Sequence, residues 1–203
     1  MDSHQRFFAK WSRFYESTPL LGPLLRRQQD LALQRLAAAS GERVLDLSCG
    51  PGRALAQLTA AGAHAIGLEH SPHMIVAAKE AGRHEPMVWG DATILPFKPA
   101  SFDKLLSTNA FHHYPNPTEA LREMRRVLRP GGKAVIVDPR LDSILSRLTI
   151  FGGEALLFGM RVHLHDLAEW QTICLEAGFS QADAEPLGTF PLPATSVIVT
   201  ARA

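Results

Sequence analysis

The sequence contains few cysteines and no long apolar segment, the features that mark disulfide-rich, metal-binding and membrane-spanning proteins. Only two cysteines, Cys49 and Cys174, occur among its 203 residues, too few for a disulfide framework and without the spacing of a metal site. No stretch reaches the ~20 apolar residues of a membrane-spanning helix, and no apolar signal core follows the N-terminus. These absences predict a cytoplasmic protein with no membrane span and no bound metal.

The chain carries no excess of positive or negative charge, and no linker segment divides it. Lys and Arg number 21, and Asp and Glu number 20, so no broad positive field arises and nucleic acid is not an expected partner. No Pro-, Gly- or Ser-rich linker divides a chain that is long enough for one compact core. We therefore expect a single domain over residues 1–203, as a monomer or a homodimer.

The most informative segment is a short apolar run that ends on Asp46 and enters the glycine-rich turn 48–52. Gly50 and Gly52 have no Cβ, so the backbone can approach a ligand closely. The Asp46 carboxylate would repel a pyrophosphate, and Leu55 stands where the dinucleotide fingerprint has its third glycine. The ligand of this turn is therefore expected to carry a cation.

S-adenosylmethionine satisfies that expectation, since it has an ammonium, a sulfonium, a ribose and an adenine but no phosphate. The segment 44–53 resembles motif I of the class I methyltransferases, and later segments resemble the next motifs of that family in the same order. These segments are 65–69, 87–97, 102–113 and 126–138. The resemblance covers residues 40–140, and the relatives most similar in pattern are the C-methyltransferases of ubiquinone and menaquinone biosynthesis.

The resemblance implies how the cofactor is held. Glu69 would accept hydrogen bonds from the ribose hydroxyls, although its spacing from the turn would also suit NAD. Asp91 would accept one from the adenine amino group, and the product would be S-adenosylhomocysteine. Tyr15 is the candidate that covers the cofactor. The other predicted cofactor-binding residues are Asp46, Ser48, Cys49, Gly50, Gly52, His70, Met74, Ala92 and Asn109.

Three residues of the turn have alternative interpretations. Ser48 replaces the family's usual first glycine, which is tolerable if this residue lies in the β region. Cys49 invites a nucleophile interpretation, but its place in the turn favours a backbone role. Arg53 could pair with a carboxylate of the cofactor or of the protein, or remain solvated.

The predicted fold is an α/β, Rossmann-like, doubly wound sheet of seven mostly parallel strands with helices on both faces. Residues 179–187 and 196–203 follow each other without a helix and should form an antiparallel hairpin at the sheet edge. Ligands of such sheets bind beyond the carboxyl ends of the strands. The strands are expected at 43–47, 64–69, 86–90, 102–108 and 133–138, and the helices at 53–61, 72–81 and 117–128.

Two regions outside this framework should decide the substrate. Residues 1–38 are expected to form a helical lid beside the core 40–140, and the apolar residues 141–165 a flap. The flap suggests an aromatic or lipophilic acceptor, but it could equally be core or a dimer contact. In the C-terminal part, 166–203, Asp166 is expected to cap the helix 165–177 and not to act as a catalytic acid.

Histidine is the natural base near neutral pH, and His112 and His113 follow the fourth strand at the cofactor end. We expect either of them to remove a proton from the acceptor. The alternative is that one lines the cofactor or caps a turn, since neighbours in an extended segment point in opposite directions.

The sequence thus predicts an enzyme that transfers a methyl group from S-adenosylmethionine to oxygen or carbon, with nitrogen possible, of a small acceptor. An NAD-dependent oxidoreductase is the first alternative, and Asp46, Leu55 and Asp91 disfavour it. A protein that binds the cofactor without turnover is the second. Nucleobase methylation is less favoured, because residues 109–112 lack the Pro-Pro-aromatic pattern of those enzymes.

Overall fold

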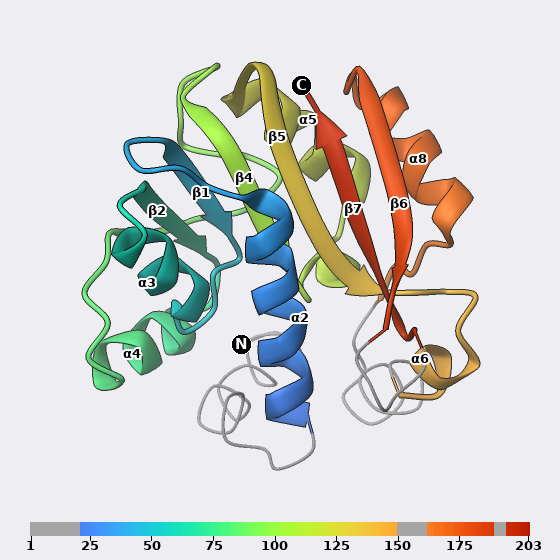
Figure 1. The fold of residues 1–203 in the computed structure, drawn as a ribbon, viewed down its shortest axis with the longest axis horizontal. Helices are drawn as coiled ribbons and strands as arrows, with labels where there is room; N and C mark the ends of the chain where they lie inside the picture. Colours follow the sequence, from blue (N-terminus) through green and yellow to red (C-terminus); the bar gives the residue numbers. More distant parts are fainter. Residues whose placement is uncertain (1–20, 150–161, 189–193) are drawn as a thin grey trace.

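The computed structural model of the chain describes residues 21–149, 162–188 and 194–203. At its centre is one seven-stranded sheet in the order β3-β2-β1-β4-β5-β7-β6 (Figure 1). Its strands are β1 (Arg43–Leu47), β2 (His64–Glu69), β3 (Met87–Trp89), β4 (Phe102–Thr108), β5 (Leu128–Pro139), β6 (Gln181–Leu187) and β7 (Ser196–Arg202). The first five pair in parallel, and β7 pairs antiparallel with both β5 and β6. The predicted parallel sheet with a C-terminal antiparallel hairpin is confirmed.

Helices cover both faces of the sheet (Figure 1). They are α2 (Leu21–Leu36), α3 (Arg53–Ala60), α4 (Pro72–Glu80), α5 (Pro117–Val127), α6 (Ile144–Thr149) and α8 (Leu167–Glu176), with the 3-10 turn η1 (Phe111–His113). The predicted helices 53–61, 72–81 and 117–128 differ from α3, α4 and α5 by one residue at their C-terminal ends. Strand β5 begins earlier than predicted because Leu128 already pairs with Phe102, before an irregularity in the register.

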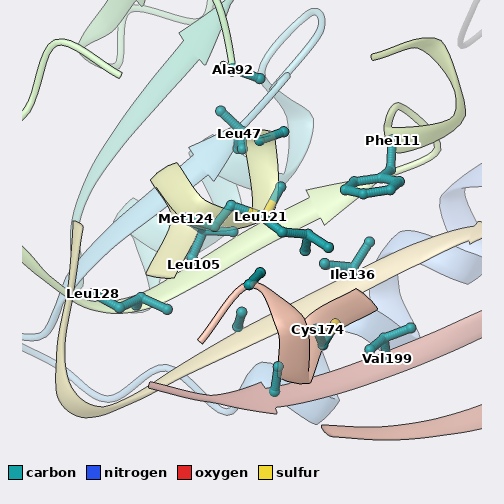
Figure 2. Close-up of a cluster of buried hydrophobic side chains, with 14 of the residues drawn as sticks. Leu47, Ala92, Leu105, Phe111, Leu121, Met124, Leu128, Ile136, Cys174 and Val199 are labelled. Carbon is teal, nitrogen blue, oxygen red and sulfur yellow. The ribbon is translucent and has the colours of Figure 1, made fainter. Parts of the chain in front are cut away.

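Two hydrophobic clusters hold these layers together, one on each face. On one face, Ala32 and Leu36 of α2 and Leu55 of α3 pack over Val44 and Leu106. The other cluster lies under α5 and α8. Figure 2 shows its labelled side chains, among them Leu121, Met124, Cys174, Leu105, Ile136 and Val199. Because neighbouring residues of a strand point to opposite faces, each central strand contributes to both clusters.

Polar side chains define where the helices on the second face begin. Asp166 accepts a hydrogen bond from the Glu169 amide (2.8 Å), and the Glu169 carboxylate accepts one from the Asp166 amide (2.9 Å). This reciprocal capping box confirms the predicted capping role of Asp166 and places the start of α8 at Leu167. At the N-cap position of α5, the Asn116 side chain accepts a hydrogen bond from the Glu119 amide (3.3 Å).

Parts of the predicted lid and flap lie outside the described residues. Tyr15 is among them, so its role as cover stays a prediction. Within the described ranges, the lid segment contributes α2, and the flap segment contributes α6 and residues 162–165.

Candidate functional site

The carboxyl ends of the parallel strands carry the predicted cofactor residues. Asp46 lies near the end of β1, Glu69 ends β2, Asp91 follows β3, and Asn109 follows β4. Strands β1, β2 and β4 are direct neighbours, with Asp46 aligned beside Gly67 and Leu106. The sheet therefore brings these side chains to one edge, where open parallel sheets bind ligands.

Glu69 is fixed by the backbone around it. One carboxylate oxygen accepts a hydrogen bond from the Gly50 amide (2.8 Å), and the other accepts one from the Ser71 amide (2.7 Å). Burial raises the pKa of the Glu69 carboxyl, and the two amides oppose this by favouring the charged form. The glycine turn and the end of β2 are thus tied together by a single carboxylate.

Asp46 is also buried, with only 1% of its surface exposed. Burial, with the nearby Glu69 charge as the second cause, raises the pKa of Asp46 to about 8. Among the described residues, its Oδ2 atom is buried with no hydrogen-bond partner. An unsatisfied buried carboxyl oxygen is rare in folded proteins, so Asp46 fits the predicted role of receiving a cation.

Ser48 lies outside the β region, so the condition under which it could readily replace glycine is not met. Its φ of 56° places it in the left-handed region, as at Asn109 (φ 52°), where residues other than glycine are uncommon. The Ser48 hydroxyl is 2.9 Å from the hydroxyl of Tyr114, which is buried. This hydrogen bond offsets part of the backbone strain at Ser48.

A cleft runs between the glycine turn and helix α2. Residues 48–51 and Thr108 and Asn109 line it on the sheet side, and the first turns of α2 line the other side. A Cβ added to Gly50 would meet no atom within 4 Å, so the backbone here faces open space. A cofactor that needs close contact with the turn therefore fits the residues present.

The remaining residues of the turn have structural partners. Arg53 donates to the Gln29 side chain and to the Asp30 carboxylate, both at 2.8 Å, so it pairs with the protein and fastens α2 to the turn. Burial raises the pKa of the Cys49 thiol well above its usual value, which keeps the thiol protonated and disfavours a nucleophile. Cys49 also packs against β2, where a Cβ on Gly67 would lie 2.6 Å from its sulfur.

Asp91, the predicted adenine contact, and Ala92 follow β3, and the predicted cofactor-binding residues Met74 and His70 lie in other segments. Asp91 accepts hydrogen bonds from the amide and hydroxyl of Thr93, at 2.8 and 2.7 Å, and its half-buried side chain remains accessible. Met74 and Ala92 are buried. His70 is exposed, and its backbone carbonyl accepts a hydrogen bond from the Trp89 ring (2.9 Å).

The two candidate bases lie on η1, directly after β4. The ring nitrogen Nδ1 of His112 lies 2.9 Å from Oδ1 of Asp138, and 2% of the His112 residue is exposed. The ring centroids of His112 and His113 lie 3.9 Å apart, with the ring planes tilted by 46°. The expectation that the two side chains point in opposite directions is wrong, because the segment is a 3-10 turn and not extended.

Sequence reasoning missed three parts of this site: Asp138, Tyr114 and the cleft-facing side of α2. Asp138 was detectable in principle, since it follows the apolar run of β5 as Asp46 follows that of β1. Tyr114 follows the histidine pair directly. No local pattern in α2 indicates which of its polar residues face the cleft, because that depends on how the helix crosses the sheet.

Comparison with known proteins identifies the fold. A family model described as "Methyltransferase domain" matches residues 45–136. Over residues 45–136 the chain is therefore similar to the class I S-adenosylmethionine-dependent methyltransferases. This confirms the predicted resemblance, and the cofactor of that family is the predicted S-adenosylmethionine.

One curated relative is similar to the chain in sequence, and two solved structures are similar to it in fold. The demethylmenaquinone methyltransferase of Renibacterium salmoninarum is 34% identical over 113 residues, 56% of this chain and 48% of that protein. The methyltransferase chain of a complex with the Haloferax volcanii Trm112 methyltransferase activator has a TM-score of 0.82, at 20% identity and 97% coverage of both chains. A Thermotoga maritima S-adenosylmethionine-dependent methyltransferase, described as a possible histamine N-methyltransferase, has a TM-score of 0.72, at 20% identity and 98% coverage of both. The chain spans about half or less of the length of the curated relatives it matches.

In the part of the chain that the structure describes, no helix combines the length and apolar character needed to cross a bilayer. The cytoplasmic location and the oligomeric state stay predictions.

Proposed function

We propose that this methyltransferase domain binds S-adenosylmethionine in the cleft beside Gly50 and transfers its methyl group to a small aromatic or lipophilic acceptor. The observation that carries the proposal is the pairing of the Glu69 carboxylate with the Gly50 amide at the strand ends, next to the buried carboxyl of Asp46. When bound, the cofactor supplies an activated methyl group on a sulfonium.

Each chemical group of the cofactor would be held by different residues. Asp46 would offset the ammonium, and Glu69 would accept from the ribose hydroxyls while keeping its two backbone amides. Asp91 would accept from the adenine amino group, with Met74 and Ala92 as apolar surface nearby. Ser48, Cys49, Gly50 and Gly52 would contribute backbone, with Asn109 at the end of β4 and His70 at the rim.

Proton removal is proposed for His112, with His113 as the second candidate. A base is effective when a further group fixes its orientation and stabilises its protonated form. Asp138 supplies such a group for His112 through the 2.9 Å contact at Nδ1, so proton exchange with an acceptor would occur at Nε2. His113 is the neighbouring imidazole, with its ring centroid 3.9 Å from that of His112.

A lipophilic acceptor is favoured by the exposed apolar residues of α6. Ile144 and Leu148 are 76% and 66% exposed, and they lie one helical turn apart, so they share a face. Helix α6 follows β5 at the same edge of the sheet as the glycine turn (Figure 1). A demethylmenaquinone methyltransferase among the relatives points to the same class of acceptor.

The first experiment titrates S-adenosylhomocysteine and, separately, NAD into the purified protein by calorimetry. We expect micromolar binding of S-adenosylhomocysteine and none of NAD. Binding of NAD alone would replace the proposal with an oxidoreductase.

Turnover is then tested with S-adenosylmethionine carrying a labelled methyl group and a panel of phenols, hydroquinones and polar amines. Labelled phenol or hydroquinone products are expected, and mass spectrometry separates O- from C-methylation. Transfer to the amines alone would overturn the lipophilic acceptor. Cofactor binding without methyl transfer to any acceptor of the panel would favour the alternative that this protein binds S-adenosylmethionine without catalysing a reaction.

A further inference from the structure

Asp91 lies in a connecting segment, residues 90–101 between β3 and β4, that has no helix or strand of its own. The Ile94 amide donates to the Asp91 carbonyl (3.2 Å) and closes a turn. Both hydrogen bonds that the Asp91 carboxylate accepts from Thr93 go to Oδ1, so Oδ2 is the oxygen that would face an adenine amino group. In a segment of this kind, the position of a carboxylate depends on what fastens the main chain around it.

Two side chains of α5 fasten this segment. The Glu123 carboxylate accepts a hydrogen bond from the Leu95 amide (2.7 Å). The Arg126 guanidinium donates to the carbonyls of Leu95 (3.0 Å) and Phe97 (2.8 Å). Three main-chain groups that follow the Asp91 turn are therefore held from one helix. A guanidinium suits this task because its five N–H donors form a rigid fork, which can reach two carbonyls and a carboxylate together.

Glu123 and Arg126 also pair with each other. The Nε and Nη2 atoms of Arg126 donate to the two carboxylate oxygens of Glu123, at 2.6 and 2.8 Å. The hydrogen bond from Arg126 lowers the pKa of the Glu123 carboxyl, which keeps it charged at neutral pH. The pair is partly buried, whereas the Arg122–Glu119 pair one turn earlier is exposed. Exposed ion pairs contribute little, so only the first pair is suited to hold a segment in place.

Apolar contacts hold the same segment in a different way. Leu95 is buried, and the Phe97 ring packs edge-on against Phe102, with ring centroids 5.1 Å apart. Such contacts are non-directional, so they fix where the segment lies but not how its peptide groups are rotated. Hydrogen bonds to those peptide groups are directional and can set the turn that carries Asp91.

We propose that the Glu123–Arg126 pair positions Asp91 for the adenine amino group and so sets the preference of the site for adenine over purines that lack this group. The pair acts through the main chain of residues 92–97, and its two members are positioning residues. This inference rests on the proposed function.

The test compares S-adenosylhomocysteine with its analogue in which unsubstituted purine replaces adenine, so that only the amino group is missing. The unaltered protein should bind S-adenosylhomocysteine about 10- to 100-fold more tightly than the analogue, the range for a hydrogen bond to a charged group. In Arg126→Ala this ratio of dissociation constants should fall to about threefold or less, with the analogue bound almost as before. Arg126→Lys should restore part of the ratio, because an ammonium can reach one carbonyl but does not reproduce the fork.

The Arg126 variants should fold, because the amides of Ala100 and Ser101 bond to the main-chain carbonyls of Arg126 and Val127, which the substitutions leave in place. Circular dichroism checks this. Should Arg126→Ala fail to fold, Glu123→Gln carries the same test, with a reduced ratio expected.

Arg122→Ala is the matched control, because it breaks an ion pair of the same spacing on the same helix, and it should keep the full ratio. Weakening of both probes by the same factor in Arg126→Ala, or an unchanged affinity for both, would overturn the inference and leave the apolar contacts as what holds the segment. Equal binding of the two probes by the unaltered protein would also overturn it, with the cofactor site standing. If the unaltered protein binds neither probe, the proposed function itself fails.

Discussion

The buried His112 ring and the buried Asp138 carboxylate form a pair in which Nδ1 lies 2.9 Å from Oδ1. Burial raises the pKa of the Asp138 carboxyl, and the contact with His112 opposes that shift. The pair joins η1, which follows β4, to the end of β5. It therefore places an oriented imidazole at the edge of the sheet that carries the glycine turn.

If His112 is the base, its removal should lower the rate and leave cofactor binding intact. We expect His112→Ala to reduce kcat by about 10²- to 10⁴-fold, the usual contribution of a positioned acid or base. Asp138→Asn, which keeps the shape of the side chain, should reduce kcat by at least tenfold. The measurements are initial rates on an acceptor found in the screen and the Kd of S-adenosylhomocysteine by calorimetry.

His113→Ala is the companion variant for this experiment, since the ring centroids of His113 and His112 lie only 3.9 Å apart. A loss of rate in His113→Ala alone would transfer the role of base to His113. Unchanged turnover in both histidine variants would leave alignment of the acceptor as the source of catalysis.

Binding of the cofactor should release a proton near pH 7. Burial and the Glu69 charge raise the pKa of Asp46 to about 8, so this carboxyl is mostly neutral at pH 7 in the cofactor-free protein. A cation beside it favours the charged form and lowers the pKa, and the proton then leaves. Affinity should therefore increase as the pH rises from 6 toward 8. Calorimetric titrations in buffers of different ionisation enthalpy measure the protons released.

Asp46→Asn supplies the control for that linkage, because an amide of similar shape cannot release a proton. Its titrations should show the same binding enthalpy in every buffer, together with weaker affinity at pH 8. Proton release that persists in Asp46→Asn would assign the linkage to another group, such as Glu69.

Local patterns predict the sheet of this protein better than the details of its site. Asp46 and Glu69 follow apolar runs that predict strands, and the resemblance to the methyltransferases implies the role of Asp91, so all three could be proposed from the sequence. The partners of Ser48 and His112 are distant in the chain, at Tyr114 and Asp138. Which of these contacts forms depends on the backbone angles of two short turns, and no periodic pattern encodes them.

The Ser48 turn can be tested by a double-mutant cycle with Tyr114. Ser48→Gly relieves a left-handed serine, worth about 1 kcal/mol. It also removes a hydrogen bond to a buried hydroxyl, which costs about the same. We expect little net change in the free energy of unfolding for Ser48→Gly alone, and stabilisation of about 1 kcal/mol when it is made in a Tyr114→Phe background. Denaturant unfolding measures both, and equal effects in the two backgrounds would refute the coupling.

Gly50 and Gly82 allow backbone strain to be separated from ligand contact. Both have positive φ, 54° and 73°, and a Cβ on either would meet no atom within 4 Å. Alanine at each position should therefore destabilise the fold by a similar ~1 kcal/mol. Only Gly50 lines the cleft, so only Gly50→Ala should weaken S-adenosylhomocysteine binding, by tenfold or more, because its methyl group would stand where the cofactor approaches the backbone. Calorimetry and denaturant unfolding on both variants make the comparison, and equal affinities would show that the cofactor does not approach this turn.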